Sequence, residues 1–168
     1  EPPAPEHPAT TRIPLRPLDA LSIPPELDGR AGENRADPGR LQIGAGCDAG
    51  VMAAVQAAIQ PGKTKLVWIE TPANPLWTVT DIAATAAIAR QAGAAVAVDS
   101  TVATPLLTRP LELGADIVMH AATKYLNGHT DLIAGALVTR EDSDLWQRIR
   151  KVRAQIGGTL GSFEAWLL

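Results

Sequence analysis

Residues 116–131 read DIVMHAATKYLNGHTD, and the chain passes here from an apolar run into a polar loop. The run Ile117–His120 is short and apolar, which predicts a buried strand. Lys124 follows closely, whereas the other three lysines fall in a predicted turn, at a strand edge and on a charged helix. Desolvation behind a buried strand favours the neutral form of an amine, so Lys124 is a candidate nucleophile.

Three other apolar runs predict strands of the same sheet, and these are Lys65–Glu70, Ala94–Asp99 and Ile133–Thr139. An alanine-rich helix that opens at Thr80 or Asp81 and ends at Gly93 joins the first two. We therefore expect a strand–helix–strand unit with a right-handed crossover. The link from 117–120 to 133–139 is short for a parallel crossover, so we expect the last strand to run antiparallel. The pattern predicts an α/β domain with a mostly parallel sheet.

Periodicity and capping residues predict further helical segments around this sheet. The first follows Asp48, has Val51, Val55 and Ile59 on one face, and ends at Pro61-Gly62. A second, short one is bracketed by Pro105 and Pro110 and closed by Gly114. A third follows Asp142 or Ser143, and a fourth begins at Gly161. The segment after Ser143 is amphipathic and is expected to bury its apolar face. The residues on that face are Leu145, Ile149, Val152 and Ile156.

Residues 1–40 differ from the rest, because nine of the 14 prolines fall there and few aliphatic residues accompany them. Proline removes backbone donors and blocks helices, so this segment is expected to be extended or disordered. The predicted organisation is a proline-rich segment at 1–40 followed by a folded domain at 41–168.

Composition excludes several classes of protein. The net charge of −3 argues against a surface for nucleic acid or for an anionic membrane. No apolar run approaches the roughly 20 residues that a membrane-spanning helix needs. The single cysteine, Cys47, excludes an internal disulfide and fits a reducing compartment, so we expect a cytoplasmic protein.

The glycine-rich segment Gly44–Gly50 allows a second interpretation, as a dinucleotide-binding loop with Glu70 as the acid that would bind ribose. Such a loop must follow a proper strand, and only Leu41-Gln42-Ile43 precede it here. A turn that enters a helix, with Asp48 as its N-cap, accounts for the segment more simply. His120 and His129 lack the spacing of a metal-ligand pair, so no metal is expected.

Polar residues follow three of the predicted strands: Asn74 follows the first, Asp99 ends the second, and Thr123 and Lys124 follow the third. In open α/β sheets ligands bind at the carboxyl ends of the strands. Taken alone, each of these residues could equally serve the fold. Asp99 can cap a turn, Asn74 between two prolines can form one, Thr123 can be an ordinary strand residue and Lys124 can be solvated.

Three blocks of sequence resemble the Cys/Met-metabolism (trans-sulfuration) enzymes, a family that depends on pyridoxal 5′-phosphate (PLP). The blocks are residues 116–135 around Lys124, residues 67–76 (VWIETPANPL) around Asn74, and residues 96–101 (VAVDST) around Asp99. The resemblance covers roughly Ile43 to Leu168. It implies the central part of a fold-type-I large domain, which is aspartate-aminotransferase-like, with helices packed on a mostly parallel sheet.

The resemblance also implies roles for these residues. Lys124 would hold the PLP aldehyde as an imine and carry protons during catalysis. Asp99 would sit beside the pyridine nitrogen and keep it protonated, so that the ring accepts electrons. Asn74 would contact the ring hydroxyl, and Thr123 would donate to the phosphate. The implied reaction is γ-replacement or β/γ-elimination on cystathionine, O-acylhomoserine or a related sulfur amino acid, in a homotetramer.

The chain departs from the family pattern at two motif positions and in length. Ala121 stands where the family usually has a serine that contacts the phosphate, and Ser100 stands where it commonly has asparagine. Family members are more than twice as long. The parts that carry the ring-stacking aromatic, the phosphate loop and the arginine for the substrate carboxylate have no counterpart here. A remnant without turnover, or a subunit-interaction fragment, is therefore the main alternative.

Overall fold

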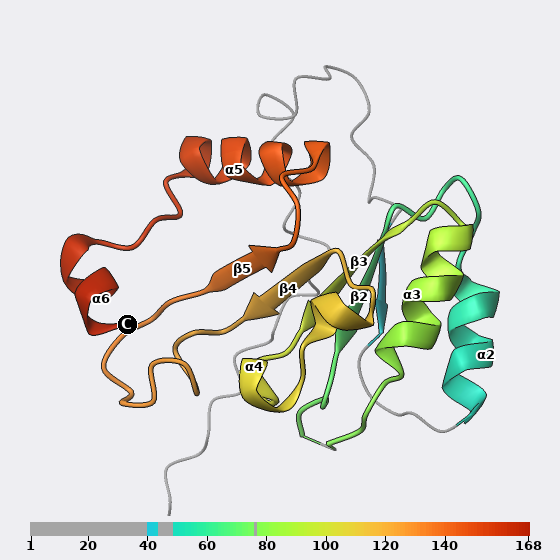
Figure 1. Ribbon diagram of the computed structural model, residues 1–168, viewed down its shortest axis with the longest axis horizontal. Helices are drawn as coiled ribbons and strands as arrows, with labels where there is room; N and C mark the ends of the chain where they lie inside the picture. The colour runs from blue at the N-terminus through green and yellow to red at the C-terminus, as the bar shows by residue number, and fades with distance from the viewer. Residues whose placement is uncertain (1–39, 44–48, 76) are drawn as a thin grey trace, which may run out of the picture. The chain divides into compact units, whose positions relative to one another are not determined.

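The structure of the chain is a computed structural model that describes residues 40–43, 49–75 and 77–168 (Figure 1). The chain divides into two units, Glu1–Ala36 and Asp37–Leu168, and every described residue falls in the second. The expectation of an extended or disordered segment at 1–40 concerns residues that, apart from Arg40, lie outside the described part. The same holds for the loop at 44–48 and its N-cap Asp48.

The described residues form one five-stranded sheet whose strands follow each other in chain order. The strands are β1 (Arg40–Ile43), β2 (Leu66–Glu70), β3 (Ala95–Asp99), β4 (Ile117–His120) and β5 (Ala136–Thr139). β1, β2, β3 and β4 run parallel to one another, and β5 pairs antiparallel with β4. The mostly parallel α/β sheet with one antiparallel strand is therefore confirmed. β1 is an addition, because residues 41–43 are too few to predict a proper strand from sequence.

The register places charged residues beside each other where the parallel strands end. Glu70 at the end of β2 pairs with Asp99 at the end of β3, and Asp99 pairs in turn with Met119 of β4. Directly paired residues lie on the same face of a sheet. Two carboxylates therefore stand on neighbouring strands on one face, at the carboxyl end of the sheet.

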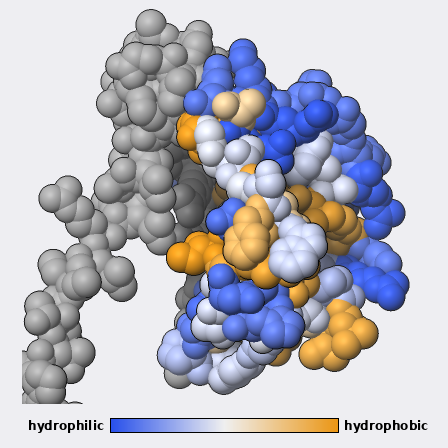
Figure 2. All heavy atoms as spheres, turned by 90° about the vertical axis from the view of Figure 1, so that its left-hand side faces the viewer, coloured by the Kyte–Doolittle hydropathy of each residue, from blue (hydrophilic) through white to orange (hydrophobic). Residues whose placement is uncertain are grey.

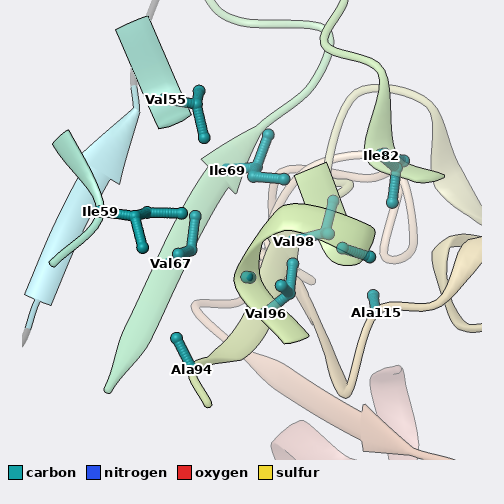
Figure 3. Packing of buried hydrophobic residues seen from close by; sticks show 11 residues of the cluster. Val55, Ile59, Val67, Ile69, Ile82, Ala94, Val96, Val98 and Ala115 are labelled. Carbon is teal, nitrogen blue, oxygen red and sulfur yellow. The ribbon is translucent and has the colours of Figure 1, made fainter. Parts of the chain in front are cut away.

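The opposite face is covered by the helices α2 (Ala49–Ala58) and α3 (Ile82–Gln91), as Figure 3 shows in close-up. Val67 and Ile69 of β2 pair with Val96 and Val98 of β3, and all four side chains are essentially removed from solvent. They pack with Ile59, just beyond the end of α2, and with side chains of both helices, which are Val55, Ile82, Ala86 and Ala89. Burial of each large aliphatic side chain contributes about 1.5–3 kcal/mol, so this cluster anchors β2 and β3 firmly.

The boundaries of α3 agree with the sequence prediction. The Asp81 side chain accepts a hydrogen bond from Ala84 N at 2.9 Å, which satisfies one of the free amides of the first turn. After the helix, Gly93 adopts a φ of +72°, a conformation that glycine adopts without strain. The short helical structure expected at the two prolines is also present, as α4 (Thr104–Leu107), which contains Pro105, and the 3₁₀ helix η2 (Pro110–Leu113), which begins at Pro110 and ends before Gly114.

The C-terminal helices are present where the sequence predicts them, but one expectation about their burial is wrong. Ser143 caps α5 (Asp144–Ile156), Gly157 ends it, and α6 is Ser162–Leu167. None of the residues of α5 is buried, including those expected on its apolar face. Leu145 and Ile156 are exposed, and Ile149 and Val152 are only partly buried, because periodicity identifies an apolar face but does not determine how fully it is covered. Figure 2 shows hydrophobic side chains at the surface on this side of the molecule.

A small second cluster ties α6 to the segment around Lys124. Ala122, Leu132 and Ala134 are buried together, and the partly buried Leu167 of α6 packs against them. In the same helix, Phe163 and Trp166 stack with ring centroids 6.0 Å apart while both remain largely exposed.

Candidate functional site

The four residues expected to bind the cofactor all lie at the carboxyl ends of consecutive parallel strands. Asn74 follows β2, Asp99 is the last residue of β3, and Thr123 and Lys124 follow β4. The chain leaves these three strands at one edge of the sheet (Figure 1). This is the edge at which open α/β sheets bind their ligands.

Asp99 is half-buried, and one of its carboxylate oxygens is fully engaged. Its Oδ1 accepts hydrogen bonds from Thr101 N at 2.9 Å and from Thr101 Oγ1 at 2.5 Å. Within the described part of the chain, Oδ2 has no hydrogen-bond donor. The carboxylate therefore has a fixed orientation and one oxygen available to a ligand.

Thr101 belongs to the VAVDST motif, but the sequence alone assigns no role to it. Besides its bonds to Asp99, its hydroxyl accepts a hydrogen bond from Ala121 N at 2.7 Å. The Asp-x-Thr spacing indicates a local turn, because aspartate commonly accepts from the amide two residues on. The bond to Ala121 spans 20 positions of sequence, and no local pattern signals it.

Lys124 lies in the turn beyond β4 and not on the strand itself. Its backbone N donates to Ala121 O at 3.0 Å, and its carbonyl accepts from Gly128 N at 2.8 Å. Its side chain is exposed in the described part of the chain, so the expected desolvation of this amine is not present. Of the two alternatives that the sequence leaves open for this side chain, the structure shows the solvated one.

Thr123 is attached to the segment that precedes β5. Its hydroxyl donates to Ala134 O at 3.2 Å and accepts from Ala134 N at 2.8 Å, and Thr123 N also donates to Ala134 O at 3.1 Å. These bonds hold Ala134, which was expected to belong to the last strand, and β5 begins only at Ala136. The hydroxyl hydrogen is engaged within the fold.

Asn74 is exposed in the loop after β2, and its backbone is held by the end of that strand. Asn74 N donates to Glu70 Oε1 at 3.1 Å. Thr71, the first residue of the loop, donates its N–H to Asp99 O at 3.1 Å, which joins the loop to β3. The Asn74 amide itself makes no bond to another described side chain, and it stands on the same edge as Asp99.

The two histidines do not meet in a ligand cluster. His120 is buried in β4, whereas His129 is exposed, with its Nδ1 2.8 Å from Asn127 O. Across the ranges that the structure describes, no group of three or more histidine, cysteine or acidic residues is placed to hold a metal ion. Those ranges also contain no helix with the length and apolarity to cross a bilayer.

The donor set fits an aldehyde-bearing heteroaromatic cofactor at two of its ends. An exposed lysine amine can condense with an aldehyde, and a fixed carboxylate with one free oxygen can pair with a protonated ring nitrogen. The two groups follow adjacent strands, and the Thr101 hydroxyl donates to the Asp99 carboxylate and accepts from the backbone N of Ala121, three residues before Lys124. An α/β sheet with a lysine and an aspartate at its ligand-binding edge is what a fold that holds PLP on a lysine requires.

The comparison with known proteins identifies the family. Residues 43–168 match the family described as Cys/Met metabolism PLP-dependent enzyme, and the chain belongs to it. A probable cystathionine gamma-synthase of Herpetosiphon aurantiacus is 44% identical over 115 residues, which are 68% of this chain and 35% of that protein. An L-methionine gamma-lyase of Porphyromonas gingivalis is 51% identical over 115 residues, which are 68% of this chain and 29% of that protein.

The fold agrees with a solved structure of the same family. Cystathionine gamma-lyase from Lactobacillus plantarum, solved in complex with L-serine, matches with a TM-score of 0.66 at 45% identity. The match covers 69% of this chain and 30% of that protein. This chain thus spans about a third of the length of the relatives it matches.

Proposed function

We propose that this chain supplies the lysine- and aspartate-bearing part of a PLP site in a trans-sulfuration enzyme. The reaction would be γ-replacement or β/γ-elimination on cystathionine, O-acylhomoserine or a related sulfur amino acid. The observation that carries the proposal is the hydrogen-bonded path from Asp99 through Thr101 to Ala121, which begins the turn that holds Lys124. This path fixes the Asp99 carboxylate relative to the backbone of the turn that carries Lys124.

When bound, PLP supplies an electron-accepting ring that stabilises negative charge at the α-carbon of an amino acid. Lys124 Nζ would hold the cofactor through its aldehyde and would carry protons for the reaction. Asp99 Oδ2 would hold the ring nitrogen in its protonated form, because a carboxylate beside a cation favours both charged states. The Asn74 amide would contact the hydroxyl of the cofactor ring.

The phosphate end depends on Thr123. Ala134 O already accepts from Thr123 N, so the Thr123 hydroxyl can turn its hydrogen toward a phosphate without leaving that carbonyl unpaired. The hydroxyl still accepts from Ala134 N at 2.8 Å in either orientation. Ala121 adds no side-chain donor, so Thr123 and backbone amides of this loop are the groups proposed to hold the phosphate.

Relatives that carry synthase and lyase names match with similar identities, 44% and 47% for two of them. The proposal therefore covers both reactions, whose choice depends on residues around the substrate. We further infer a homotetramer in the cytoplasm, which the family resemblance and the single cysteine support. The exposed apolar residues of α6, Phe163 and Trp166, favour burial against further protein.

A titration of the chain with PLP tests the cofactor assignment. We expect a visible absorbance band of lysine-bound cofactor that is lost in Lys124→Ala and retained in Lys63→Ala. Lys63 is a suitable control because it is also exposed and lies in the turn before β2, away from the carboxyl ends of the strands. An unchanged band in Lys124→Ala would reject the role of Lys124.

A second candidate is a PLP-binding or subunit-interaction fragment without turnover. It is favoured by the share of the relatives that this chain spans, about a third, and by the incompletely buried apolar face of α5. Assays with cystathionine and with O-acylhomoserine separate the two candidates. Turnover that requires Lys124 supports the enzyme, whereas cofactor binding without turnover supports the fragment.

A further inference from the structure

A single hydroxyl joins the ends of two neighbouring strands at the proposed cofactor site. Thr101 Oγ1 donates to Asp99 Oδ1 at 2.5 Å and accepts from Ala121 N at 2.7 Å. Asp99 ends β3, and Ala121 is the first residue after β4. The Thr101 hydroxyl thus donates its one hydrogen to Asp99 at the end of β3, and one of its lone pairs accepts from the backbone of the segment that leads to Lys124.

The bonds to Asp99 restrict how that carboxylate is presented. Hydrogen bonds from a neutral donor to an ionised acceptor are short and stronger than neutral ones. Two of them converge on Oδ1, from the hydroxyl and the amide of Thr101, so rotation of the carboxylate would break both. Oδ2 is consequently the oxygen that faces a ligand.

The bond to Ala121 restricts the other half of the site. Ala121 O accepts from Lys124 N at 3.0 Å and closes the turn that carries the lysine. Ala121 N is fixed by Thr101 through the only hydrogen bond that this amide makes to a described residue. A shift of Thr101 would therefore move the acid and the lysine-bearing turn relative to each other.

We propose that Thr101 is a positioning residue that sets the separation and orientation of Asp99 and Lys124 for cofactor binding. The inference rests on the proposed function. Thr101 acts through Asp99 and Ala121 and does not itself contact the cofactor. A threonine that only closed the turn after β3 would affect folding but would not act on the cofactor through Asp99.

The test compares Thr101→Val, which removes the hydroxyl at nearly constant volume, with Thr101→Ser, which keeps it. We expect PLP affinity to fall roughly tenfold or more in the valine variant, as for loss of a hydrogen bond to a charged group. The serine variant should restore most of it. Thr85→Val is the matched control, because Thr85 is buried in α3 and its hydroxyl donates to Asp81 O at 2.8 Å, outside the site. It should lose stability but keep PLP affinity.

A double-mutant cycle decides whether Thr101 acts through Asp99. Residues in one hydrogen-bond network have non-additive effects. Thr101→Val should weaken PLP binding in the unaltered chain and have a clearly smaller effect in an Asp99→Ala background, where the carboxylate that accepts from Thr101 is absent. Equal losses in the two backgrounds would overturn the inference.

Amide hydrogen exchange of the apo chain supplies a readout that needs neither cofactor nor a folded valine variant. The Ala121 amide should be protected from exchange in the unaltered chain and in Thr101→Ser. Rapid exchange there would overturn the proposed link. If the unaltered chain does not bind PLP, the proposed function is rejected and this inference with it. If the unaltered chain and Thr101→Val bind PLP with equal affinity, this inference alone is rejected.

Discussion

Thr123 and Ala134 are joined by three hydrogen bonds, which are Thr123 N to Ala134 O at 3.1 Å, Thr123 Oγ1 to Ala134 O at 3.2 Å, and Ala134 N to Thr123 Oγ1 at 2.8 Å. They close the loop that begins after β4 and carries Lys124. The same loop is packed from inside by Ala122, Leu132 and Ala134. The lysine is therefore exposed on a loop whose two ends are firmly attached.

Replacement of Thr123 by valine should destabilise this loop. It leaves Ala134 N without its acceptor, which costs about 1–3 kcal/mol in free energy of unfolding, measured by urea denaturation. Thr123→Ser keeps the hydroxyl and should recover most of the loss. Equal stability of the valine variant and the unaltered chain would show that the hydroxyl bond to Ala134 is not formed in solution.

Two isoleucines at opposite extremes of burial test the assignment of the core. Ile69 in β2 is 0% exposed, whereas Ile133 is 87% exposed. Ile69→Ala should lower the free energy of unfolding by about 2–5 kcal/mol, because it leaves a cavity between the sheet and its helices. Ile133→Ala should change it by less than about 0.5 kcal/mol. Similar losses in the two variants would contradict the described burial.

Two glycines with positive φ separate backbone strain from steric contact. Gly93 has a φ of +72° with open space around it, and Gly114 has a φ of +99° with Ala86 Cβ 3.2 Å from an added Cβ. Gly93→Ala should cost about 1–2 kcal/mol from backbone conformation alone. Gly114→Ala should cost at least about 1 kcal/mol more, because it also presses on α3. Chemical denaturation of the pair measures the difference, and equal losses would count against this contact.

The buried Ser100 hydroxyl should be dispensable for stability. Ser100 is fully buried, and within the described residues its Oγ has no hydrogen-bond partner. Ser100→Ala removes an unpaired polar group, so the free energy of unfolding should stay the same or rise by up to about 1 kcal/mol. Thr85→Val, which deletes a buried hydroxyl that is bonded, should lower it by about 1 kcal/mol. A loss of that size in Ser100→Ala would show that Oγ has a partner in solution.

The sequence predicted the parts of the fold that depend on local patterns. The apolar runs became β2, β3 and β4, and Asp81 and Ser143 cap their helices. β1 was missed because four residues after Pro38-Gly39 carry little signal, and the strand is supported by parallel pairing with β2. The buried face of α5 was wrong because periodicity does not tell what covers a helix.

The same limit applies to the site. Asn74, Asp99, Thr123 and Lys124 were found because motif spacing places them after strands, and the sheet does bring those strand ends together. Thr101 and the attachment of Thr123 to Ala134 depend on bonds between segments far apart in sequence. The expected burial of Lys124 depended on where the turn directs its side chain, which the strand pattern does not determine.

The central claim is that the Lys124 amine holds the cofactor, and a trapped adduct tests it most directly. The chain is incubated with PLP, reduced with borohydride, digested and analysed by peptide mass spectrometry. The account predicts the phosphopyridoxyl mass on the peptide that contains Lys124, at one equivalent per chain, with the other three lysines unmodified. A label spread over the lysines, or retained in full by Lys124→Ala, would contradict it.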